Sequence, residues 1–367
     1  MSLNVIELAG TPREMGRQFG EALREQSRAF AEMRLNGCVE KCRELGLQKV
    51  DARFVLEVCD RCVDYHRRYD EAVWEEMAGI AEGAGLSEPM LIICNGLTDV
   101  RDAVQAAAGA PWARQPAADA GGCTAWMAAP EATAIDCTLV GQTWDMHAGA
   151  QEYVVAVKRK PRQGPATISM TTAGCLSLAG INSRGVAVGN NNLRPIDARP
   201  GVNYLAMIHK ALSQGHLGGA VNAITGAYRC SGHNYYMADA EGTIVDVETT
   251  AVEHEVIQPA GAVYAHTNHY LTPRLEGLAV PEALGPSTLW RLTRMLHVLS
   301  EQAGEITPAS MMAAMSDSSG EGDCRICRND PKDLGPTCGA VVMCPQERKI
   351  WIAPGEPKVE TFVELGL

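Results

Sequence analysis

The pattern of hydrophobic and polar residues changes character near residue 110. Before that point, apolar residues recur every three to four positions among charged ones, the spacing of amphipathic helices. Only the run Val5-Ile6-Glu7-Leu8 alternates like a strand. Thr11, Pro12 and Glu14 then supply a cap, a first-turn proline and an early acid for a first helix. We therefore expect residues 1–108 to form a mainly helical N-terminal region.

Residues 109–122 have no periodicity of either kind. The segment holds two prolines, three glycines and small residues, which favour turns and leave no apolar face to bury. We predict an exposed loop here, joining the helical region to the remainder of the chain.

From Cys123 onward the pattern is mostly that of strands, with helices between them. Asn182-Ser183-Arg184-Gly185 and Asp239-Ala240-Glu241-Gly242 read as the turns of two hairpins. Strands followed by helices and then strands again indicate two sheets with helices packed outside them, an α+β fold over residues 123–367. The expected strands are 124–129, 139–144, 153–158, 166–171, 175–181, 186–190, 233–238, 243–248, 340–343, 350–353 and 359–362, and the expected helices are 203–214, 217–228, 284–301 and 307–315.

Composition narrows the class of protein. Hydrophobic residues make up 46% and charged residues 21% of the 367, which is typical of a folded globular chain. The net charge of −12 argues against a nucleic-acid partner, whose phosphates it would repel. No stretch approaches the roughly 18–20 apolar residues of a membrane helix, and the first residues lack the features of a secretory signal. We expect a cytoplasmic protein without a membrane partner; a homo-oligomer is compatible with the sequence.

The cysteines allow a second interpretation. Thirteen of them in a chain without a signal peptide suit reduced thiols better than a disulfide framework. Two pairs, Cys59/Cys62 and Cys324/Cys327, have the Cys-x-x-Cys spacing of some zinc and redox sites. The first pair falls in a helical stretch, where cysteine also serves as a small buried residue. We expect no metal site, and keep a metal- or redox-active protein as an alternative.

The residues Gly121-Gly122-Cys123 carry the strongest chemical signal. A nucleophile at this position follows a loop and begins a strand. The glycine before the nucleophile has no side chain that would block attack on the glycine carbonyl. If the Cys123 thiol cleaved its own chain, the new α-amine would have a pKa of roughly 7.7–8.0. That amine could serve as general base for the thiol. A glycine turn leading to a buried strand cysteine explains the same residues without catalysis.

Further motifs along the chain resemble the penicillin acyltransferase-like family (acyl-coenzyme A:isopenicillin N acyltransferase and its relatives), and they occur in the same order. They are Gly10-Thr11-Pro12-Arg13-Glu14-Met15-Gly16-Arg17-Gln18-Phe19-Gly20, Gly122-Cys123-Thr124, Gly141-Gln142-Thr143-Trp144-Asp145, Gly180-Ile181-Asn182-Ser183-Arg184-Gly185, Ser231-Gly232-His233-Asn234-Tyr235, Ala265-His266-Thr267-Asn268-His269-Tyr270 and Ile326-Cys327-Arg328. The resemblance implies a four-layer αββα N-terminal-nucleophile hydrolase fold that cleaves itself, here between Gly122 and Cys123.

The resemblance also implies roles for single residues. Cys123 would be the nucleophile, and Asn268 would stabilise the oxyanion, since an amide donates hydrogen bonds without carrying charge. Asp145 would hold or orient the new amine. Arg328 would bind a carboxylate of the substrate, although a surface salt bridge explains it nearly as well. Thr124 would contact the substrate beside the nucleophile or only pack locally.

Other polar residues are candidates on their own chemistry. His147 departs from the apolar or aromatic residue frequent at that place in the family, and could shape the substrate pocket. Asn191, in the middle of three asparagines, suits a polar pocket wall or a solvated turn equally well. His233, His266 and His269 would allow a Cys–His pair of papain type, but the amine base favours structural roles for them.

The function that these features favour is hydrolysis of the linear amide bond of a small N-acyl substrate through a Cys123 thioester. Transfer of an acyl group from acyl-coenzyme A to an amine shares the chemistry up to the acyl-enzyme. No phosphate-binding glycine loop or basic cluster suited to coenzyme A stands out, so we expect hydrolysis without a cofactor. A binding protein that kept the scaffold is a third hypothesis.

Overall fold

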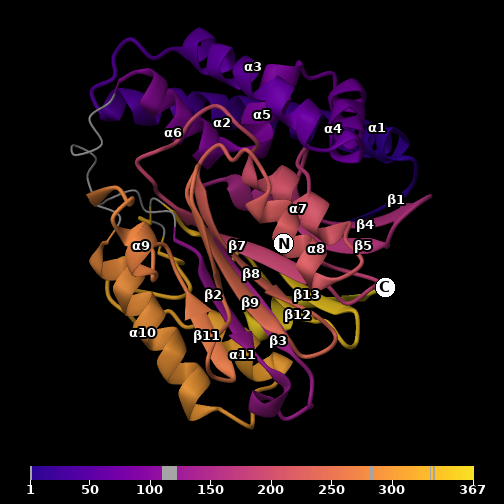
Figure 1. The fold of residues 1–367 in the computed structure, drawn as a ribbon, viewed down its shortest axis with the longest axis vertical. Coiled ribbons are helices and arrows are strands. Elements are labelled where there is room, and N and C mark those ends of the chain that lie inside the picture. Colours follow the sequence, from indigo (N-terminus) through magenta and orange to yellow (C-terminus); the bar gives the residue numbers. More distant parts are fainter. Residues whose placement is uncertain (1, 110–121, 282–283, 331, 334) are drawn as a thin grey trace.

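Two stacked β-sheets form the centre of the computed structural model, which describes residues 2–109, 122–281, 284–330, 332–333 and 335–367 (Figure 1). In these residues one sheet has eight strands in the order β1-β4-β5-β6-β7-β8-β9-β10, and the other has six in the order β11-β2-β3-β12-β13-β14. The strands are β1 (Asn4–Gly10), β2 (Thr124–Ala128), β3 (Leu139–Asp145), β4 (Val154–Pro161), β5 (Thr167–Thr172), β6 (Ala179–Asn182), β7 (Ala187–Leu193), β8 (Gly232–Ala238), β9 (Ile244–Thr249), β10 (His254–Ile257), β11 (Val263–His266), β12 (Thr337–Cys344), β13 (Lys349–Pro354) and β14 (Val363–Gly366).

Helices cover both outer faces of this sandwich. α7 lies against β6 and β7 of the eight-stranded sheet, and α10 and α11 lie against β2, β3, β11 and β12 of the other. The result is the four-layer αββα arrangement, so the expected fold class is confirmed. The helices are α1 (Pro12–Ala22), α2 (Arg24–Glu44), α3 (Ala52–Tyr69), α4 (Glu71–Ala84), α5 (Glu88–Asn95), α6 (Leu97–Ala107), α7 (Tyr204–Leu212), α8 (Leu217–Thr225), α9 (Pro273–Glu276), α10 (Pro286–Glu301) and α11 (Pro308–Met315).

Several inner strands are buried on both faces because each sheet lies between a second sheet and a helical layer. Every residue of β3, β8 and β12 is buried, including polar ones such as Gln142 and Asn234, so burial on both faces removes the polar and apolar alternation of a half-exposed strand. The two predicted hairpins are present as β6–β7 and β8–β9. The strand expected at 359–362 is wrong: that segment is a short 3-10 turn, and the edge strand β14 follows it. The partly exposed strand β10 was not expected.

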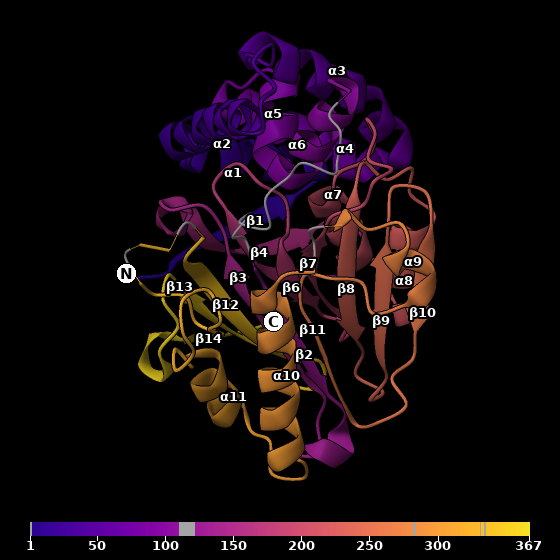
Figure 2. The same cartoon turned by 90° about the vertical axis from the view of Figure 1, so that its left-hand side faces the viewer.

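The N-terminal helices gather at one end of the sandwich in both views (Figures 1 and 2). Thr11 and Glu14 form the capping box at the start of α1, and Asp51 and Asp70 cap α3 and α4. Gly85 ends α4 with a φ of 68°, a left-handed conformation that glycine adopts without strain. Capping residues that are close in the sequence therefore set where these helices begin and end.

The expected processing loop at 109–122 falls mainly outside the described residues, which end at Gly109 and resume at Gly122. Among the helices that the structure describes, no single one has the length and apolar character needed to cross a membrane. α4 and α5 together meet that test of length and composition, with a bend of 110° between them.

Helices α1 and α4 approach so closely that only glycine fits at their crossing. A Cβ on Gly16 would lie 2.0 Å from the backbone oxygen of Glu76, and one on Gly79 would lie 2.3 Å from that of Arg13. Gly16 belongs to the opening sequence motif, so close helix packing explains this part of the motif.

Gly79→Ala should therefore destabilise the protein by about 1–3 kcal/mol, although alanine is the better helix former. Gly37→Ala on α2 is the matched control, since a Cβ there meets nothing within 4 Å. It should stabilise by up to about 1 kcal/mol. Denaturant unfolding of both variants measures the difference, and equal effects would contradict the packing argument.

Candidate active site

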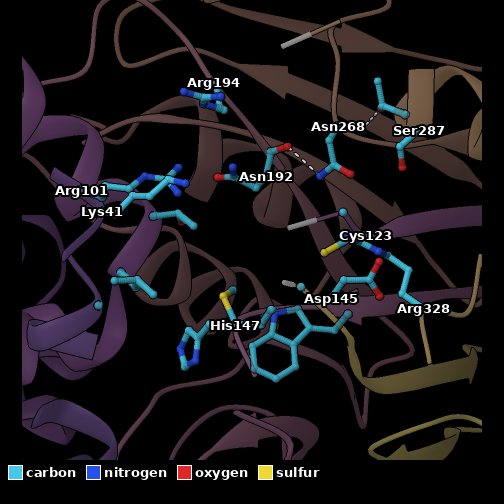
Figure 3. Close-up of a pocket in the computed structure, with 18 of the residues that line it drawn as sticks. Lys41, Arg101, Cys123, Asp145, His147, Asn192, Arg194, Asn268, Ser287 and Arg328 are labelled. Carbon is cyan, nitrogen blue, oxygen red and sulfur yellow. Dashed lines mark hydrogen bonds between the residues drawn. The ribbon is translucent and has the colours of Figure 1, made fainter. Parts of the chain in front are cut away.

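A cavity of about 430 Å³ opens where the start of β2 meets the N-terminal helices. It joins segments that are far apart in the sequence, as Figure 3 shows. Its lining includes Lys41, Leu97, Thr98, Arg101, Gly122, Cys123, Trp144, Asp145, Met146, His147, Asn190, Asn192, Arg194, His233, Asn268, Ser287, Arg291, Asp323 and Arg328.

Cys123 stands immediately before β2, which pairs with β3 in a register that places Thr124 opposite Thr143. That register brings Cys123 to the end of β3, beside Trp144 and Asp145. Its side chain is almost completely buried but lines the cavity. Burial and the negative charge of Asp145 raise the pKa of the Cys123 thiol to about 12, although backbone hydrogen bonds involving Asp145 and Asn192 act in the opposite direction. In the intact chain the thiol is therefore protonated at neutral pH.

Asp145 is a buried carboxyl group at the carboxyl end of β3. Its Oδ1 accepts a hydrogen bond from Thr337 Oγ1 at 2.7 Å, whereas its Oδ2 is buried without a hydrogen-bond partner among the described residues. Burial raises the pKa of Asp145 to about 7, with the positive charges of Arg291 and Arg328 opposing that rise. A carboxyl group with this pKa and an unpaired oxygen can exchange a proton near neutral pH.

Asn268 faces Cys123 across the cavity (Figure 3). Its Nδ2 donates to the backbone oxygen of Asn192 at 2.9 Å, and its Oδ1 accepts from Arg291 Nη2 at 2.9 Å. Since both ends of the amide are held, the orientation of its N–H donors is set. Asn268 lies in the loop just after β11.

Arg291 connects these groups and was not found by sequence reasoning. From α10 its Nη1 donates to the backbone oxygen of Cys123 at 2.7 Å and to Thr124 Oγ1 at 3.1 Å. A Cβ on Gly122 would lie 2.5 Å from Arg291 Nη2, so the guanidinium leaves room only for glycine before Cys123. A signal was available: Arg291 falls on the apolar stripe of α10 with Met295 and Val298, where a charge needs a partner.

A match to a known sequence family covers most of the chain that carries this site. Residues 133–359 match the sequence model of the acyl-coenzyme A:6-aminopenicillanic acid acyl-transferase family. The chain belongs to this family. The expected resemblance is thereby confirmed, and the protein is an enzyme of the acyl-transferase family. The matched range includes Asp145, Asn268, Arg291 and Arg328, while Cys123 lies ten residues before it.

Solved structures of a hydrolase and of an acylase are similar at low identity. A mutant of conjugated bile acid hydrolase from Clostridium perfringens is 12% identical with a TM-score of 0.45, and covers 66% of this chain and 92% of its own. A second variant of that hydrolase is 13% identical with a TM-score of 0.46 and the same coverage. Penicillin V acylase from Agrobacterium tumefaciens is 12% identical with a TM-score of 0.41, covering 63% of this chain and 83% of its own.

Two of the expected substrate contacts are occupied by protein groups in this acyl-transferase family member. Arg328 lines the cavity but pairs with Asp323, and its side chain is only 2% exposed. Thr124 is completely buried, does not line the cavity, and accepts a hydrogen bond from Arg291. This hydrogen bond to Arg291 agrees with the alternative in which Thr124 has only a local role.

The asparagine expected to line the cavity faces away from it. Asn191 is buried and its Oδ1 accepts a hydrogen bond from Asn234 Nδ2 at 3.1 Å, on the opposite face of β7 from the cavity. Alternation along the strand brings its neighbours Asn190 and Asn192 to the cavity instead. The cavity-lining asparagines of β7 are therefore the two neighbours of Asn191, and Asn191 itself is not one of them.

The histidines differ in whether they line the cavity. His147 lines the cavity as expected, and burial lowers its pKa to about 4, so it is neutral at pH 7. His266 pairs with Glu248 at 2.8 Å, and His269 contacts Thr288 Oγ1 at 2.9 Å. Neither of these two lines the cavity, and no described histidine is hydrogen-bonded to the Cys123 thiol.

The Cys-x-x-Cys pairs lie apart from the cavity lining. Cys59 and Cys62 are buried in α3, as expected for small apolar side chains, and all thirteen cysteines are free thiols. Among the described residues, no group of three or more His, Cys, Asp or Glu side chains is arranged to hold a metal ion.

The buried Asp145 should make stability depend on pH. Its folded-state pKa of about 7 exceeds the ordinary 3.8, so folding favours the protonated form. That contribution is fully present below about pH 3.8 and is lost as the pH rises through 7. In an uncleaved Cys123→Ala background, the stability of Asp145→Asn relative to its parent should therefore increase from pH 4 to pH 7.5. Urea unfolding at a series of pH values measures this, and a flat or decreasing difference would show that Asp145 has no raised pKa.

Proposed function

We propose that this protein is a self-processing amidohydrolase that cleaves the linear amide bond of a small N-acyl substrate through a thioester on Cys123. The observation that carries the proposal is the placement of a cavity-lining thiol, at the start of a strand, beside a buried carboxyl group with an unpaired oxygen. A third group, Asn268, presents a fixed amide to the same space. Family membership supports acyl chemistry, and these three groups supply a nucleophile, a proton acceptor and an oxyanion donor.

The first step would be cleavage of the chain at Gly122–Cys123. The Cys123 sulfur attacks the Gly122 carbonyl carbon, the C–N bond to Cys123 breaks, and the nitrogen takes up the thiol proton as it becomes an amine. Asp145, with a pKa of about 7, is suited to carry that proton between the two atoms. Water then hydrolyses the thioester, which releases Gly122 as a carboxylate and restores the thiol.

The new α-amine of Cys123 would then act as the base. The unpaired Oδ2 of Asp145 offers a partner for its ammonium form, and that pairing would lower the pKa of Asp145 below its value in the intact chain. Loss of the peptide bond also places this ammonium group next to the thiol. A cationic neighbour favours the thiolate form of a cysteine. Processing would thus convert an inert thiol into a nucleophile.

In turnover, the thiolate attacks the substrate carbonyl carbon. The protonated α-amine of Cys123 gives a proton to the nitrogen of the substrate amide as the C–N bond breaks. Negative charge develops on the carbonyl oxygen, where Asn268 Nδ2 would donate a hydrogen bond. Arg291 acts through Asn268, since it holds the amide oxygen and leaves the nitrogen directed at the cavity. Water completes the reaction by hydrolysing the acyl-enzyme.

Acyl transfer to an amine is the second candidate, and the name of the matched family favours it. Both reactions share the thioester and differ only in the acceptor. Mass spectrometry of the products formed with and without an added primary amine separates the two outcomes.

Cleavage itself is the first test of this function. The purified protein should consist of two associated fragments, 1–122 and 123–367, and N-terminal sequencing of the larger should begin Cys-Thr-Ala-Trp. Cys123→Ala should remain one folded, inactive chain, whereas the controls Cys59→Ala and Cys324→Ala should be processed and active. Cleavage at any other bond, or a processed Cys123→Ala chain, would refute the mechanism.

The oxyanion role of Asn268 is the second test. Asn268→Ala should lower kcat by about 10²–10³-fold, because one transition-state donor is lost. The exposed Asn222→Ala on α8 is the matched control, and His269→Gln tests a histidine base. Both should keep near-normal turnover, with circular dichroism confirming the fold of each. A His269→Gln enzyme as impaired as Asn268→Ala would support a Cys–His pair instead.

A further inference from the structure

Two buried cysteines from opposite sides of the Gly122–Cys123 bond meet inside the protein. Cys94 lies near the end of α5, and Cys175 lies in the loop between β5 and β6. Their sulfur atoms are 3.7 Å apart, which is hydrogen-bond distance for two thiols. Both side chains are fully buried, and neither residue lines the cavity. The pair is therefore separate from the candidate active site.

The backbone segments that carry the two cysteines also lie close together. Cys175 Sγ donates to the backbone oxygen of Cys94 at 3.0 Å, and Cys94 Sγ lies 3.8 Å from the backbone oxygen of Ala173. Gly174 leaves room for this contact, because a Cβ there would lie 3.3 Å from Cys94 Sγ. Closing the gap from 3.7 Å to the roughly 2.05 Å of a disulfide bond lies within the reach of a rotation about χ1.

A buried arginine lies beside this pair. Arg34 on α2 is fully buried, its Nη1 lies 3.9 Å from Cys175 Sγ, and the same nitrogen donates to the backbone oxygen of Cys94. In the part of the chain that the structure describes, its Nε and Nη2 have no hydrogen-bond partner and no carboxylate forms an ion pair with it. A buried cation is costly unless negative charge is near. The thiolate form of Cys175 supplies such charge.

The surroundings give the two sulfurs different proton affinities. Burial disfavours a thiolate at Cys175, but the hydrogen bond from Cys94 and the positive charge of Arg34 outweigh it and lower the pKa of the Cys175 thiol. The hydrogen bond with Cys175 and burial together raise the pKa of Cys94 well above its usual range. Cys175 is thus the nucleophilic sulfur, and Cys94 is its protonated neighbour.

A second pair of thiols spans the same peptide bond. Cys62 on α3 is hydrogen-bonded to Cys230, which lies just before β8. That hydrogen bond and burial raise the pKa of Cys230, and the negative charges of Asp99 and Asp102 add to the rise. Negative charge nearby opposes formation of the reactive thiolate. The pair with Arg34 beside it is therefore the better candidate for oxidation.

We propose that Cys94 and Cys175 form a reversible disulfide bond when the protein meets hydrogen peroxide. In the processed protein this bond joins fragments 1–122 and 123–367, a role that rests on the proposed cleavage. A link of this kind matters because unfolding of a cleaved chain releases two molecules, so its apparent stability falls on dilution. The disulfide makes the two fragments one molecule again.

The reaction proceeds in two steps. The Cys175 sulfur attacks one peroxide oxygen, the O–O bond breaks, and the other oxygen takes up a proton and leaves as water, so that Cys175 becomes a sulfenic acid. The Cys94 sulfur then attacks the Cys175 sulfur, the S–S bond forms, and the hydroxide leaves with the Cys94 proton as a second water. The two sulfurs lose two electrons in total, and these reduce the peroxide. A dithiol reductant reverses the bond.

Peptide mapping tests the bond in the wild-type protein. The protein is treated with hydrogen peroxide, its remaining thiols are alkylated, and its digest is analysed by mass spectrometry with and without reductant. We expect a linked pair of peptides that contain Cys94 and Cys175 and separate on reduction. On a non-reducing gel the oxidised, processed protein should run as one species, and reduction should resolve it into two. Its denaturation midpoint should be independent of protein concentration after oxidation and should fall on dilution after reduction.

Variants assign the link to these residues. Cys94→Ala and Cys175→Ala should each abolish it. Cys38→Ala is the matched control and should keep it, because Cys38 is also buried and is hydrogen-bonded to another cysteine of the same fragment.

Arg34→Met should slow formation of the link at pH 7 by about tenfold, since the thiolate loses its cationic neighbour. The exposed Arg43→Met on α2 is the control for this change and should keep the rate.

The outcomes separate this inference from the proposed function. Absence of the Cys94–Cys175 peptide pair from oxidised wild-type protein would overturn the disulfide. A link that survives Cys94→Ala and is lost in Cys230→Ala would also overturn it, in favour of the second pair. An uncleaved chain that yields the Cys94–Cys175 peptides would retain the disulfide and refute self-processing. A processed, active enzyme without these peptides would do the reverse.

Discussion

The arrangement around the cavity depends on one buried cation, the guanidinium of Arg291. A charged group in the interior is costly unless its donors are satisfied and negative charge is near. Arg291 meets both needs, because it donates to Cys123, Thr124, Ser287 and Asn268, and the carboxylate of Asp145 opposes the effect of burial on its pKa. The same hydrogen bonds join α10 to the start of β2 and to the loop after β11. Satisfying this one charge therefore holds Cys123 and Asn268 in one fixed arrangement.

Burial also sets the proton affinities at the site. It raises the pKa values of both Cys123 and Asp145, so the intact chain holds a protonated thiol beside a carboxyl group that titrates near neutrality. A newly formed ammonium group would reverse this balance by supplying positive charge where the Oδ2 of Asp145 has no partner.

The N-terminal helices contribute more than a cover for the sandwich. Their glycine crossing between α1 and α4 fixes a compact layer, and α2 and α6 extend from it to the cavity. Lys41 on α2 and Leu97 and Arg101 on α6 line that cavity, so the helices before Cys123 supply part of its wall.

The sequence by itself determined the local features of this protein. Helix caps such as Thr11 and Asp70, the two hairpin turns, and the order of the family motifs depend on neighbouring residues, and short-range interactions decide them. Cys123, Asp145 and Asn268 were selected from motifs, and the structure brings these three to one cavity.

Only the tertiary structure decided which side chains face that cavity. β7 is buried almost throughout, so no polar alternation indicates which of its three asparagines points where, and packing of the sheets places Asn190 and Asn192 at the cavity and Asn191 away from it. The place of Arg291 has the same origin. It lies 168 residues after Cys123 in the sequence and meets Cys123 only through the packing of helices on sheets, which no local pattern encodes.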